Sequence, residues 1–341
     1  MKTIEYGVKA LGLKKFFFKE EQQNFIAVAT PNIGTTNLGD EIISEAVIYQ
    51  LQELFPQDFL ISYPTHTMLG SQTLNSFNSA RLRFIGGSNL MTGHIRLSYN
   101  QWCVPLEDFW KYRSSILFGV GWREYQGKPS LFSRIFYSAL LSKELLHSVR
   151  DSYAEEKMKA LGYSNVLNTC CPTTWGLTPD FCRNISTERR KYCIVALNGY
   201  ARAESDRAMI DAVLQNYEKC FFFQQGPGDL KYLSELTNKL SSFIVLPPKL
   251  AVYNKILQEE KPDFIGTRLH GGIRALQYGC RALIVAIDNR SIDIARDINL
   301  PVIPMEDVSN GLPKILRDGW NIQIHIPEEN IRQWKAQFQN Q

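Results

Sequence analysis

Apolar runs of strand length alternate along this chain with segments of helical period, most plainly in the C-terminal half. There the pattern predicts strands at 192–197, 220–224, 243–246, 263–267 and 282–287, and helices near 206–215, 230–240 and 250–259. Alternation of this kind is typical of a parallel sheet covered by helices on both faces.

The N-terminal half has the pattern of a second α/β unit. Its predicted strands lie at 25–29, 59–62, 82–85, 115–119 and 148–150, with helices from about residue 40 to 54 and behind Ser152. Two facing units of this class would bring the carboxyl ends of both sheets to one cleft, where ligands bind in open parallel sheets. We therefore expect the chemistry in the connections that follow the strands.

The segment between the two halves is rich in residues that break helices and strands, with two prolines and a glycine between residues 172 and 179. We place the domain boundary near Arg183. This gives an N-terminal α/β domain of residues 1–183 and a C-terminal α/β domain of residues 184–341, which ends in a helix that begins near Pro327.

The composition is that of a large globular chain, with 341 residues, 44% apolar content and a formal charge of +4. The charge excess is spread out, without the lysine and arginine runs of a nucleic-acid-binding surface. No apolar stretch approaches the roughly 20 residues of a membrane span, and the start is too charged for a signal peptide. Seven cysteines without a CxxC pair indicate free thiols in a reducing compartment. We expect a cytoplasmic protein.

One segment, DFIGTRLHGG at residues 263–272, has the pattern of an anion site. A strand that ends near Arg268, followed by His270 and two glycines that open a helix, would place a guanidinium, an imidazole and backbone N–H groups around one small volume. Such a volume suits phosphate or carboxylate. The alternative for His270 is a histidine satisfied within a turn.

Two connections in the N-terminal half carry further candidates. In TPNIGTTNLGDEII, Asn37 and Asp40 precede an apolar helix, and Asp40 is either an N-cap or a sugar-hydroxyl contact and general base. Gly86 and Gly87 follow a strand, so they either bring backbone N–H groups against a ligand or serve as ordinary turn residues.

Arg150 and Asp151 also follow a strand, and Arg150 would supply a second positive charge or stabilise the wall between the domains. Gln224 and Gln225 close a strand at the same cleft edge, where they would bind sugar hydroxyls or cap the loop. No HxH, HExxH or CxxC spacing indicates a metal site, and we expect neither metal nor cofactor.

In their order and spacing these pieces resemble the polysaccharide pyruvyl transferase family. The matching motifs are N-x-G-D at Asn37 to Asp40, the pair Gly86 and Gly87, V-R-D at Val149 to Asp151, and R-L-H-G at Arg268 to Gly271. The resemblance covers the chain from about Ala27 to Arg290. It implies two Rossmann-like domains facing a cleft, similar to the GT-B glycosyltransferase fold. It also implies phosphoenolpyruvate as donor, a polysaccharide-precursor sugar as acceptor, and a pyruvate ketal as product.

We expect a donor site formed by Arg268, Leu269, His270, Gly271, Arg202 and Arg150. Arg268 would clamp an anion, because its planar fork binds phosphate or carboxylate in bidentate fashion, and His270 would act as general acid. Family members often have an arginine where this chain has Asn198, so the second donor arginine is open between Arg150 and Arg202.

We expect an acceptor site formed by Asn37, Asp40, Gly86, Gly87 and Gln224, with Asp40, Arg268 and His270 as the catalytic set. Asp288 and Arg290 follow another strand as an ion pair or as ligand contacts. His66 and His94 lie in loops that would face the acceptor or the solvent.

Two other functions fit the same pattern. A glycosyltransferase that uses a nucleotide sugar would need the same basic and backbone groups, and Asn198 keeps a non-catalytic sugar-binding homologue open. The acceptor is a sugar or a lipid-linked oligosaccharide. In the lipid-linked case the basic and apolar segment 1–19 would either contact the inner face of the cytoplasmic membrane or form an extra helix on the domain.

Overall fold

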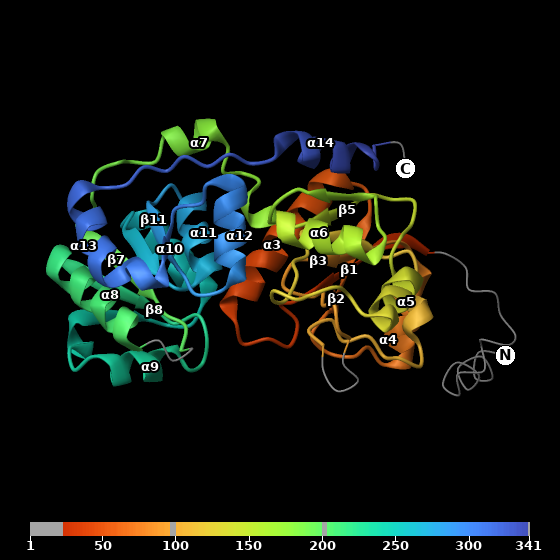
Figure 1. Cartoon of the computed structure of the whole chain (residues 1–341), viewed down its shortest axis with the longest axis horizontal. Coiled ribbons are helices and arrows are strands. Elements are labelled where there is room, and N and C mark those ends of the chain that lie inside the picture. The colour runs from red at the N-terminus through yellow and green to blue at the C-terminus, as the bar shows by residue number, and fades with distance from the viewer. Residues whose placement is uncertain (1–22, 96–99, 200–202, 340–341) are drawn as a thin grey trace, which may run out of the picture.

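Each half of the chain folds around its own parallel sheet, and the two units lie side by side (Figure 1). The structure is a computed structural model that describes residues 23–95, 100–199 and 203–339. The predicted class, α/β with two Rossmann-like domains facing a cleft, is confirmed. The N-terminal segment 1–19 and Arg202 lie outside the described residues.

The first domain contains β1 (Gln23–Thr30), α3 (Leu38–Leu54), β2 (Phe59–Pro64), α4 (Ser71–Ser79), β3 (Ala80–Gly86), η1 (Phe109–Tyr112), β4 (Ile116–Phe118), α5 (Leu131–Leu140), β5 (His147–Val149), α6 (Ser152–Leu161) and β6 (Val166–Asn168). Four strands form a sheet in the order β2-β1-β3-β4, and β5 pairs with β6. An isolated parallel bridge between Val120 and Val149 connects the two groups. The order reverses between β1 and β3, whose carboxyl ends therefore border a crevice.

The second domain follows η2 (Pro172–Thr174) and α7 (Pro179–Arg183) and contains β7 (Tyr192–Ala196), α8 (Ala203–Asn216), β8 (Lys219–Phe223), α9 (Asp229–Leu236), η3 (Leu240–Ser242), β9 (Phe243–Leu246), α10 (Leu250–Glu259), β10 (Asp263–Gly266), α11 (Leu269–Gln277), β11 (Ala282–Ala286), α12 (Asn289–Ile298), β12 (Val302–Pro304), η4 (Met305–Asp307) and α13 (Val308–Asp318). The strand order β12-β11-β10-β7-β8-β9 is that of a Rossmann fold. It reverses between β7 and β10, so a ligand site is expected there.

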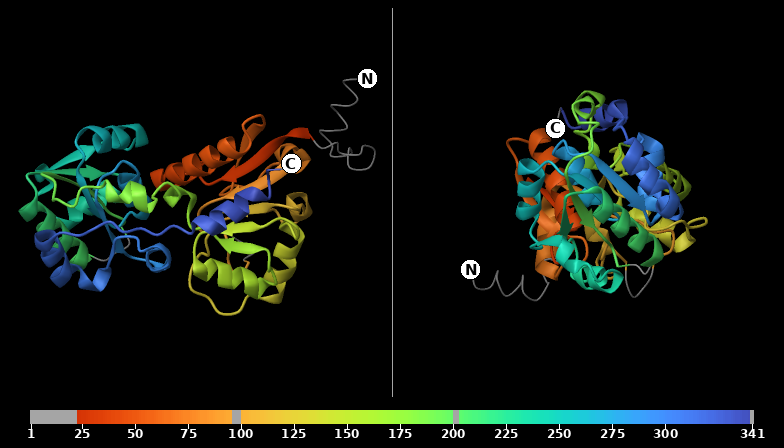
Figure 2. Two further views of the ribbon diagram at one scale, coloured as in Figure 1. Left: turned by 90° about the horizontal axis from the view of Figure 1, so that it is seen from above. Right: turned by 90° about the vertical axis from the view of Figure 1, so that its left-hand side faces the viewer.

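The last helix, α14 (Glu328–Ala336), returns to the first domain (Figure 2). Its Trp334 is fully buried and stacks on Phe118 of β4, with ring centroids 4.5 Å apart. Ile331 and Phe338 join the same apolar cluster against β1, β3 and α3. The final residues of the chain therefore complete the core of the domain in which the chain begins.

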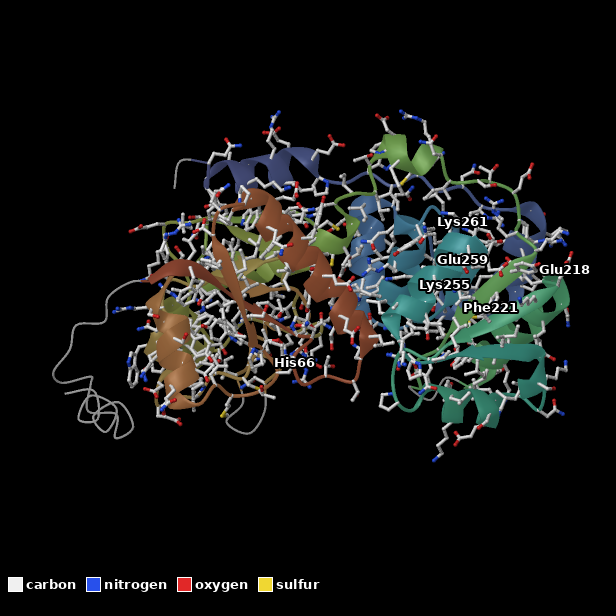
Figure 3. The ribbon with its side chains drawn as sticks, turned by 180° about the vertical axis from the view of Figure 1, so that it is seen from behind. His66, Glu218, Phe221, Lys255, Glu259 and Lys261 are labelled. Carbon is white, nitrogen blue, oxygen red and sulfur yellow. The ribbon has the colours of Figure 1, made fainter. Side chains whose placement is uncertain are left out.

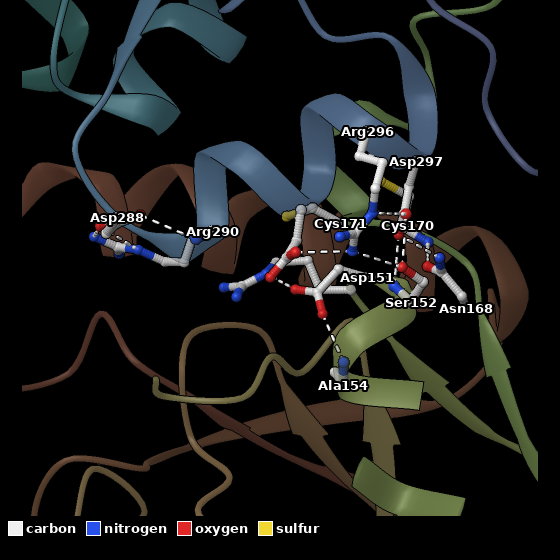
Figure 4. Close-up of polar contacts among 12 residues, drawn as sticks. Asp151, Ser152, Ala154, Asn168, Cys170, Cys171, Asp288, Arg290, Arg296 and Asp297 are labelled. Atoms are coloured by element: carbon white, nitrogen blue, oxygen red, sulfur yellow. Dashed lines mark hydrogen bonds and ion pairs between the residues drawn. The ribbon is translucent and has the colours of Figure 1, made fainter. Parts of the chain in front are cut away.

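Polar contacts on α12 hold the second domain against α6 of the first (Figure 4). The Asp297 carboxylate accepts hydrogen bonds from the Ser152 backbone N–H at 2.5 Å, from the Ser152 hydroxyl at 2.7 Å and from the Asn168 amide at 2.8 Å. The Tyr125 hydroxyl donates to Asp293 at 3.0 Å. Because Asp297 accepts from the first turn of α6, it acts as a cap supplied from the other domain.

A second contact joins the start of α3 to the loop after β8. The Leu38 N–H donates to the Gln225 carbonyl at 3.0 Å, and the Gln225 side chain donates to Asn37 at 3.2 Å. Asn37 is the N-cap of α3 and accepts from the Gly39 N–H. The suggestion that Asp40 caps this helix is therefore wrong, since Asp40 lies within the first turn.

Most predicted strands begin and end within two residues of the observed ones. The predicted helix at 230–240 ends earlier, as α9 stops at Leu236. In the described part of the chain no helix has the length and apolar content to cross a membrane. Within those same residues no group of three His, Cys, Asp or Glu side chains is placed to hold a metal ion.

His147 predicts how stability depends on pH. Its ring is fully buried, accepting from the Leu117 N–H at 3.1 Å and donating to the Ser142 carbonyl at 2.8 Å, and burial lowers its pKa to about 4. Between about pH 6.5 and about pH 4 the unfolded chain binds a proton here that the folded chain does not, so the free energy of unfolding falls as pH falls. Urea unfolding should show a loss on the order of 3 kcal/mol from this group.

The matched variant is His147→Asn, which keeps an acceptor for the Leu117 N–H but cannot titrate in this range. Its unfolding free energy should depend less steeply on pH over this window, although it will be less stable at neutral pH. An unchanged slope would show that His147 is not the group responsible.

Candidate active site

A cavity of about 310 Å³ lies between the domains at the carboxyl ends of both sheets. Residues after β1 and β3 line it from the first domain, and residues after β7 and β10 line it from the second. These are the positions at which each strand order reverses. The site therefore lies where both topologies favour ligand binding.

Three helices begin at this cavity. Asn37 precedes α3, Arg268 precedes α11 and Asp288 precedes α12, and all three residues line the cavity. Asp288 caps α12, whereas α11 has no side-chain cap. The first N–H groups of a helix and its dipole favour an anion. Of these three helix starts, that of α11 leaves its first N–H groups without a side-chain acceptor, which favours an anion there.

Arg268 is held in one orientation at the start of α11. Its Nε donates to the Leu197 carbonyl at 2.8 Å, and its Nη2 forms an ion pair with Asp229. Asp229 also accepts from the Gln225 N–H at 3.0 Å and the Gly226 N–H at 2.8 Å. Burial raises the Asp229 pKa despite the charge of Arg268. The guanidinium is thus positioned before any ligand binds.

His270 lies in the first turn of α11 and is 4% exposed. Its Nε2 is 3.8 Å from the Cys171 sulfur, at the contact between the domains. Burial, and then the charges of Arg290 and Arg150, lower its pKa to about 3, against a smaller effect of Asp288. The imidazole is therefore neutral at pH 7, and acid catalysis by His270 would require the ligand's negative charge to raise its pKa.

Arg150 does not line the cavity but lies buried beside it. Its Nε donates to Asp151 at 3.1 Å, and its buried Nη2 has no hydrogen-bond acceptor among the residues that the structure describes. Asp151 also caps α6 by accepting from the Ala154 N–H at 2.7 Å. Arg150 thus contributes positive potential toward His270 rather than a surface for direct contact.

Asp40 and His66 face the cavity from the first domain (Figure 3 labels His66). The Thr35 hydroxyl donates to Asp40 at 2.9 Å, and burial raises the pKa of this carboxyl. The Thr65 hydroxyl lies 2.8 Å from Nδ1 of His66, and burial lowers the His66 pKa while Asp40 opposes that change. A carboxylate with raised pKa is a better base, which suits Asp40 to accept a proton from a hydroxyl.

Arg290 lies across the cavity and pairs with Asp288, its Nε 2.9 Å from the carboxylate. Burial would raise the Asp288 pKa, but the charges of Arg290 and Arg150 bring it below its usual value. The structure thus shows the ion pair, which lies in the cavity wall, and contact of either residue with a ligand stays a prediction.

Sequence reasoning missed Arg123, which lines the cavity from the loop after β4. Within the described residues its side chain makes no hydrogen bond or ion pair, unlike those of Arg268 and Arg290. The buried amide oxygens of Asn89 and Gln101, also cavity-lining, have no partner. Unsatisfied polar groups around a polar cavity indicate a ligand with hydroxyl groups. The position of Arg123 after a strand was the available signal, but no motif accompanies it.

Among the predicted site residues, Asn37, Asp40, Arg268, Leu269 and His270 line the cavity, whereas Gly86, Gly87, Gln224, Gly271 and Arg150 do not. His94 is exposed and lies away from the cavity. Ser88 and Asn89 line it in place of the glycine pair, and Gln225 in place of Gln224.

The glycine pair has a packing role. Gly87 has φ +69°, and a Cβ there would lie 2.0 Å from Cγ2 of Ile43 on α3. A Cβ on Gly86 would lie 2.6 Å from Val47. The two glycines therefore let α3 approach β3 closely, which sets the direction in which the start of α3 points.

Known proteins share the fold of this chain, and one protein family shares most of its sequence pattern. The fold is similar to that of a proposed UDP-N-acetylglucosamine 2-epimerase from Listeria monocytogenes, with a TM-score of 0.52, 11% identity, and 92% of this chain and 91% of that chain covered. The two facing domains are thus of the GT-B type. The family model for polysaccharide pyruvyl transferase matches residues 37–289, and the chain belongs to that family.

Two further likenesses are too distant to support an argument. UDP-GlcNAc 2-epimerase from Neisseria meningitidis has a TM-score of 0.46 at 11% identity, covering 93% of this chain and 95% of that chain. The heptosyltransferase WaaC of E. coli has a TM-score of 0.37 at 10% identity, covering 86% and 99%. No curated protein matches the chain by sequence.

The packing around Arg150 gives a test of the site's wall. A Cβ on Gly121 would lie 2.2 Å from Cζ of Arg150, so Gly121→Ala should displace the guanidinium. Overpacking of this kind costs about 1–3 kcal/mol in the free energy of unfolding, measured by urea denaturation. Gly127→Ala is the control, because Gly127 is in the same loop with nothing within 4 Å of the added Cβ. Equal stability of the two variants would contradict the packing.

Proposed function

We propose that this protein transfers the pyruvyl group of phosphoenolpyruvate onto two hydroxyls of one sugar, as a ketal, during synthesis of a surface or exopolysaccharide. The observation that carries the proposal is the convergence of three helix N-termini, Arg268 and His270 on one cavity in a member of the polysaccharide pyruvyl transferase family. A donor with a phosphate and a carboxylate needs this concentration of positive potential.

The donor would bind against the second domain. The uncapped start of α11 and the fixed Arg268 suit one anionic group, and Arg290 at the start of α12 suits the other. Arg150 would strengthen the same potential from behind. Arg123 is a further candidate for the second donor arginine, beside the earlier choice between Arg150 and Arg202.

The acceptor sugar would bind against the first domain. The unpartnered amide oxygens of Asn89 and Gln101 suit sugar hydroxyls, and Gln225 presents a third such oxygen from the opposite side. Asn37 and Asp40 complete this wall, with Asp40 placed to take a hydroxyl proton. The donor and the acceptor would thus meet between the domains.

The reaction balances without a cofactor. One sugar oxygen bonds to C2 of phosphoenolpyruvate while C3 takes a proton and becomes a methyl group. The bond between C2 and the phosphate oxygen then breaks, phosphate leaves with the electron pair, and the second sugar oxygen bonds to C2. Of the two hydroxyl protons, one is matched by the C3 proton and the other by the proton that phosphate gains. Asp40 would accept the first hydroxyl proton, and His270 would protonate C3 or the leaving phosphate.

The acceptor would be assembled in the cytoplasm, free, nucleotide-linked or lipid-linked. A glycosyltransferase that uses a nucleotide sugar is the alternative, since a diphosphate would bind the same helix N-termini. A third candidate is a homologue that binds sugar without catalysis. It is favoured by Asn198, which lies in the cavity where an arginine was expected.

The first test is phosphate release from phosphoenolpyruvate with a panel of galactose, mannose, glucose and N-acetylhexosamine acceptors. Release should depend on the acceptor and fall at least about a hundredfold in Arg268→Ala and in His270→Ala, because each removes a group that contacts developing charge. Arg268→Lys should also lose activity, since lysine lacks the planar fork.

Arg317→Ala is the matched control, because Arg317 is exposed on α13 and lies outside the cavity. Its phosphate release should equal that of the wild type. Absence of release with every acceptor, together with thermal stabilisation by a nucleotide sugar and none by phosphoenolpyruvate, would favour the glycosyltransferase instead.

A second test concerns the proton of His270. Burial lowers its pKa to about 3, and a bound donor's negative charge should raise this pKa, so donor binding should take up as much as about one proton and become tighter as pH falls. Calorimetry in buffers of different ionisation enthalpy measures this uptake. His270→Asn should lack it, and equal uptake in both proteins would exclude His270 as the group that gains the proton.

A further inference from the structure

Helix α5 is apolar on both of its faces. Its inner face packs into the first-domain core through Phe136 and Tyr137. On its outer face Leu131 is 73% exposed, Ile135 58% and Phe132 46%. Surface helices of globular proteins ordinarily turn a polar stripe to water. The outer face of α5 is therefore a candidate for contact with an apolar partner.

The exposed apolar area continues onto η1, which packs beside α5. The rings of Phe109 and Phe136 stack with centroids 5.9 Å apart. Next to this contact Trp110 is 40% exposed and Leu106 is 37% exposed. We call these five residues, Leu106, Trp110, Leu131, Phe132 and Ile135, the α5 face.

A peripheral helix of the second domain has charged residues on its outer face instead. Helix α10 of the second domain presents Lys255 and Glu259 to the solvent, 3.9 Å apart (Figure 3). The sequence of α5, LFSRIFYSAL, contains one charged residue, Arg134, and no acid. A water-exposed role does not explain this composition.

Two exposed cationic side chains lie on α5 and just before it. Arg134 on α5 and Lys128 just before it are exposed, and their side chains make no hydrogen bond or ion pair within the part of the chain that the structure describes. The nearest acids in sequence are Glu124, which lines the cavity and accepts a hydrogen bond from the Gln126 amide at 3.1 Å, and Glu144. On the η1 side Glu107 is exposed and Asp108 pairs with Lys111 at 3.3 Å. Two unpaired cations beside bulky apolar side chains complement an anionic surface.

We propose that the α5 face docks on a lipid bilayer that carries anionic headgroups. The leucines, isoleucine and phenylalanine would enter the boundary between headgroups and acyl chains, with Trp110 at the interface and Arg134 and Lys128 against lipid phosphates. The chain runs from Arg123 in the cavity directly into α5, so docking would bring the cavity close to lipid-attached sugars. The surface contact stands independently of the chemistry proposed for the cavity.

The test is co-sedimentation of the full chain with vesicles of phosphatidylcholine alone and of an equal mixture with phosphatidylglycerol. Wild type should bind the mixed vesicles more tightly, and the triple variant L131S/F132S/I135S should bind them at least about tenfold more weakly. R134E should lower binding to mixed vesicles specifically. The control is I244S/V245S, which removes two exposed apolar side chains from β9 in the second domain and should bind like wild type.

Thermal unfolding should show that every variant is folded. The proposal is overturned if wild type binds neither vesicle, or if the triple variant binds as wild type does, in which case residues outside the α5 face carry the binding. It is also overturned if light scattering shows a wild-type dimer that the triple variant lacks while vesicle binding is equal, since the face would then join two copies of the chain.

Discussion

Three helices point their amino-terminal ends into one cavity, where their dipoles create a positive potential. The ion pairs and the histidine pKa near these helix starts are consistent with that potential. Asp288 and Asp229 are drawn into ion pairs with the two arginines at these helix starts. His270, in the first turn of α11, has a pKa lowered to about 3 by burial and by the charges of Arg290 and Arg150. Arg123, Arg268 and Arg290 line this cavity together with Asp40, Glu124 and Asp288, so the helix starts add positive potential to a wall that carries charges of both signs.

The start of α3 joins those of α11 and α12 at the cavity only if the domains hold their relative position. Gln225 links the loop after β8 to the start of α3, while Asp297 caps α6 from the opposite domain. The two contacts lie on different elements around the cavity. Helix α12 lines the cavity with its first turn and carries Asp297, which caps α6 of the other domain, in its last turn. One helix therefore both forms part of the cavity wall and holds the two domains in their relative position.

The sequence predicted the fold better than the site, for a physical reason. Strand and helix periodicity is local, and Arg268, Leu269 and His270 reach the cavity as consecutive residues, so both could be predicted from the sequence. Ser88, Asn89 and Arg123 enter the cavity through loop shapes and through contacts between distant segments, which no local pattern encodes. At Gly86 and Gly87 the sequence could not distinguish close helix packing from close ligand approach, because both require the absence of a side chain.

Helix α14 has a consequence for synthesis of the chain. The first domain buries Trp334 and Phe338 against strands made from its earliest described residues, so its core is incomplete until these residues have left the ribosome. The second domain buries Ile322 and Ile324, which come shortly before this helix. The first-made domain is therefore expected to reach its final packing together with the second, and not as a separate earlier unit.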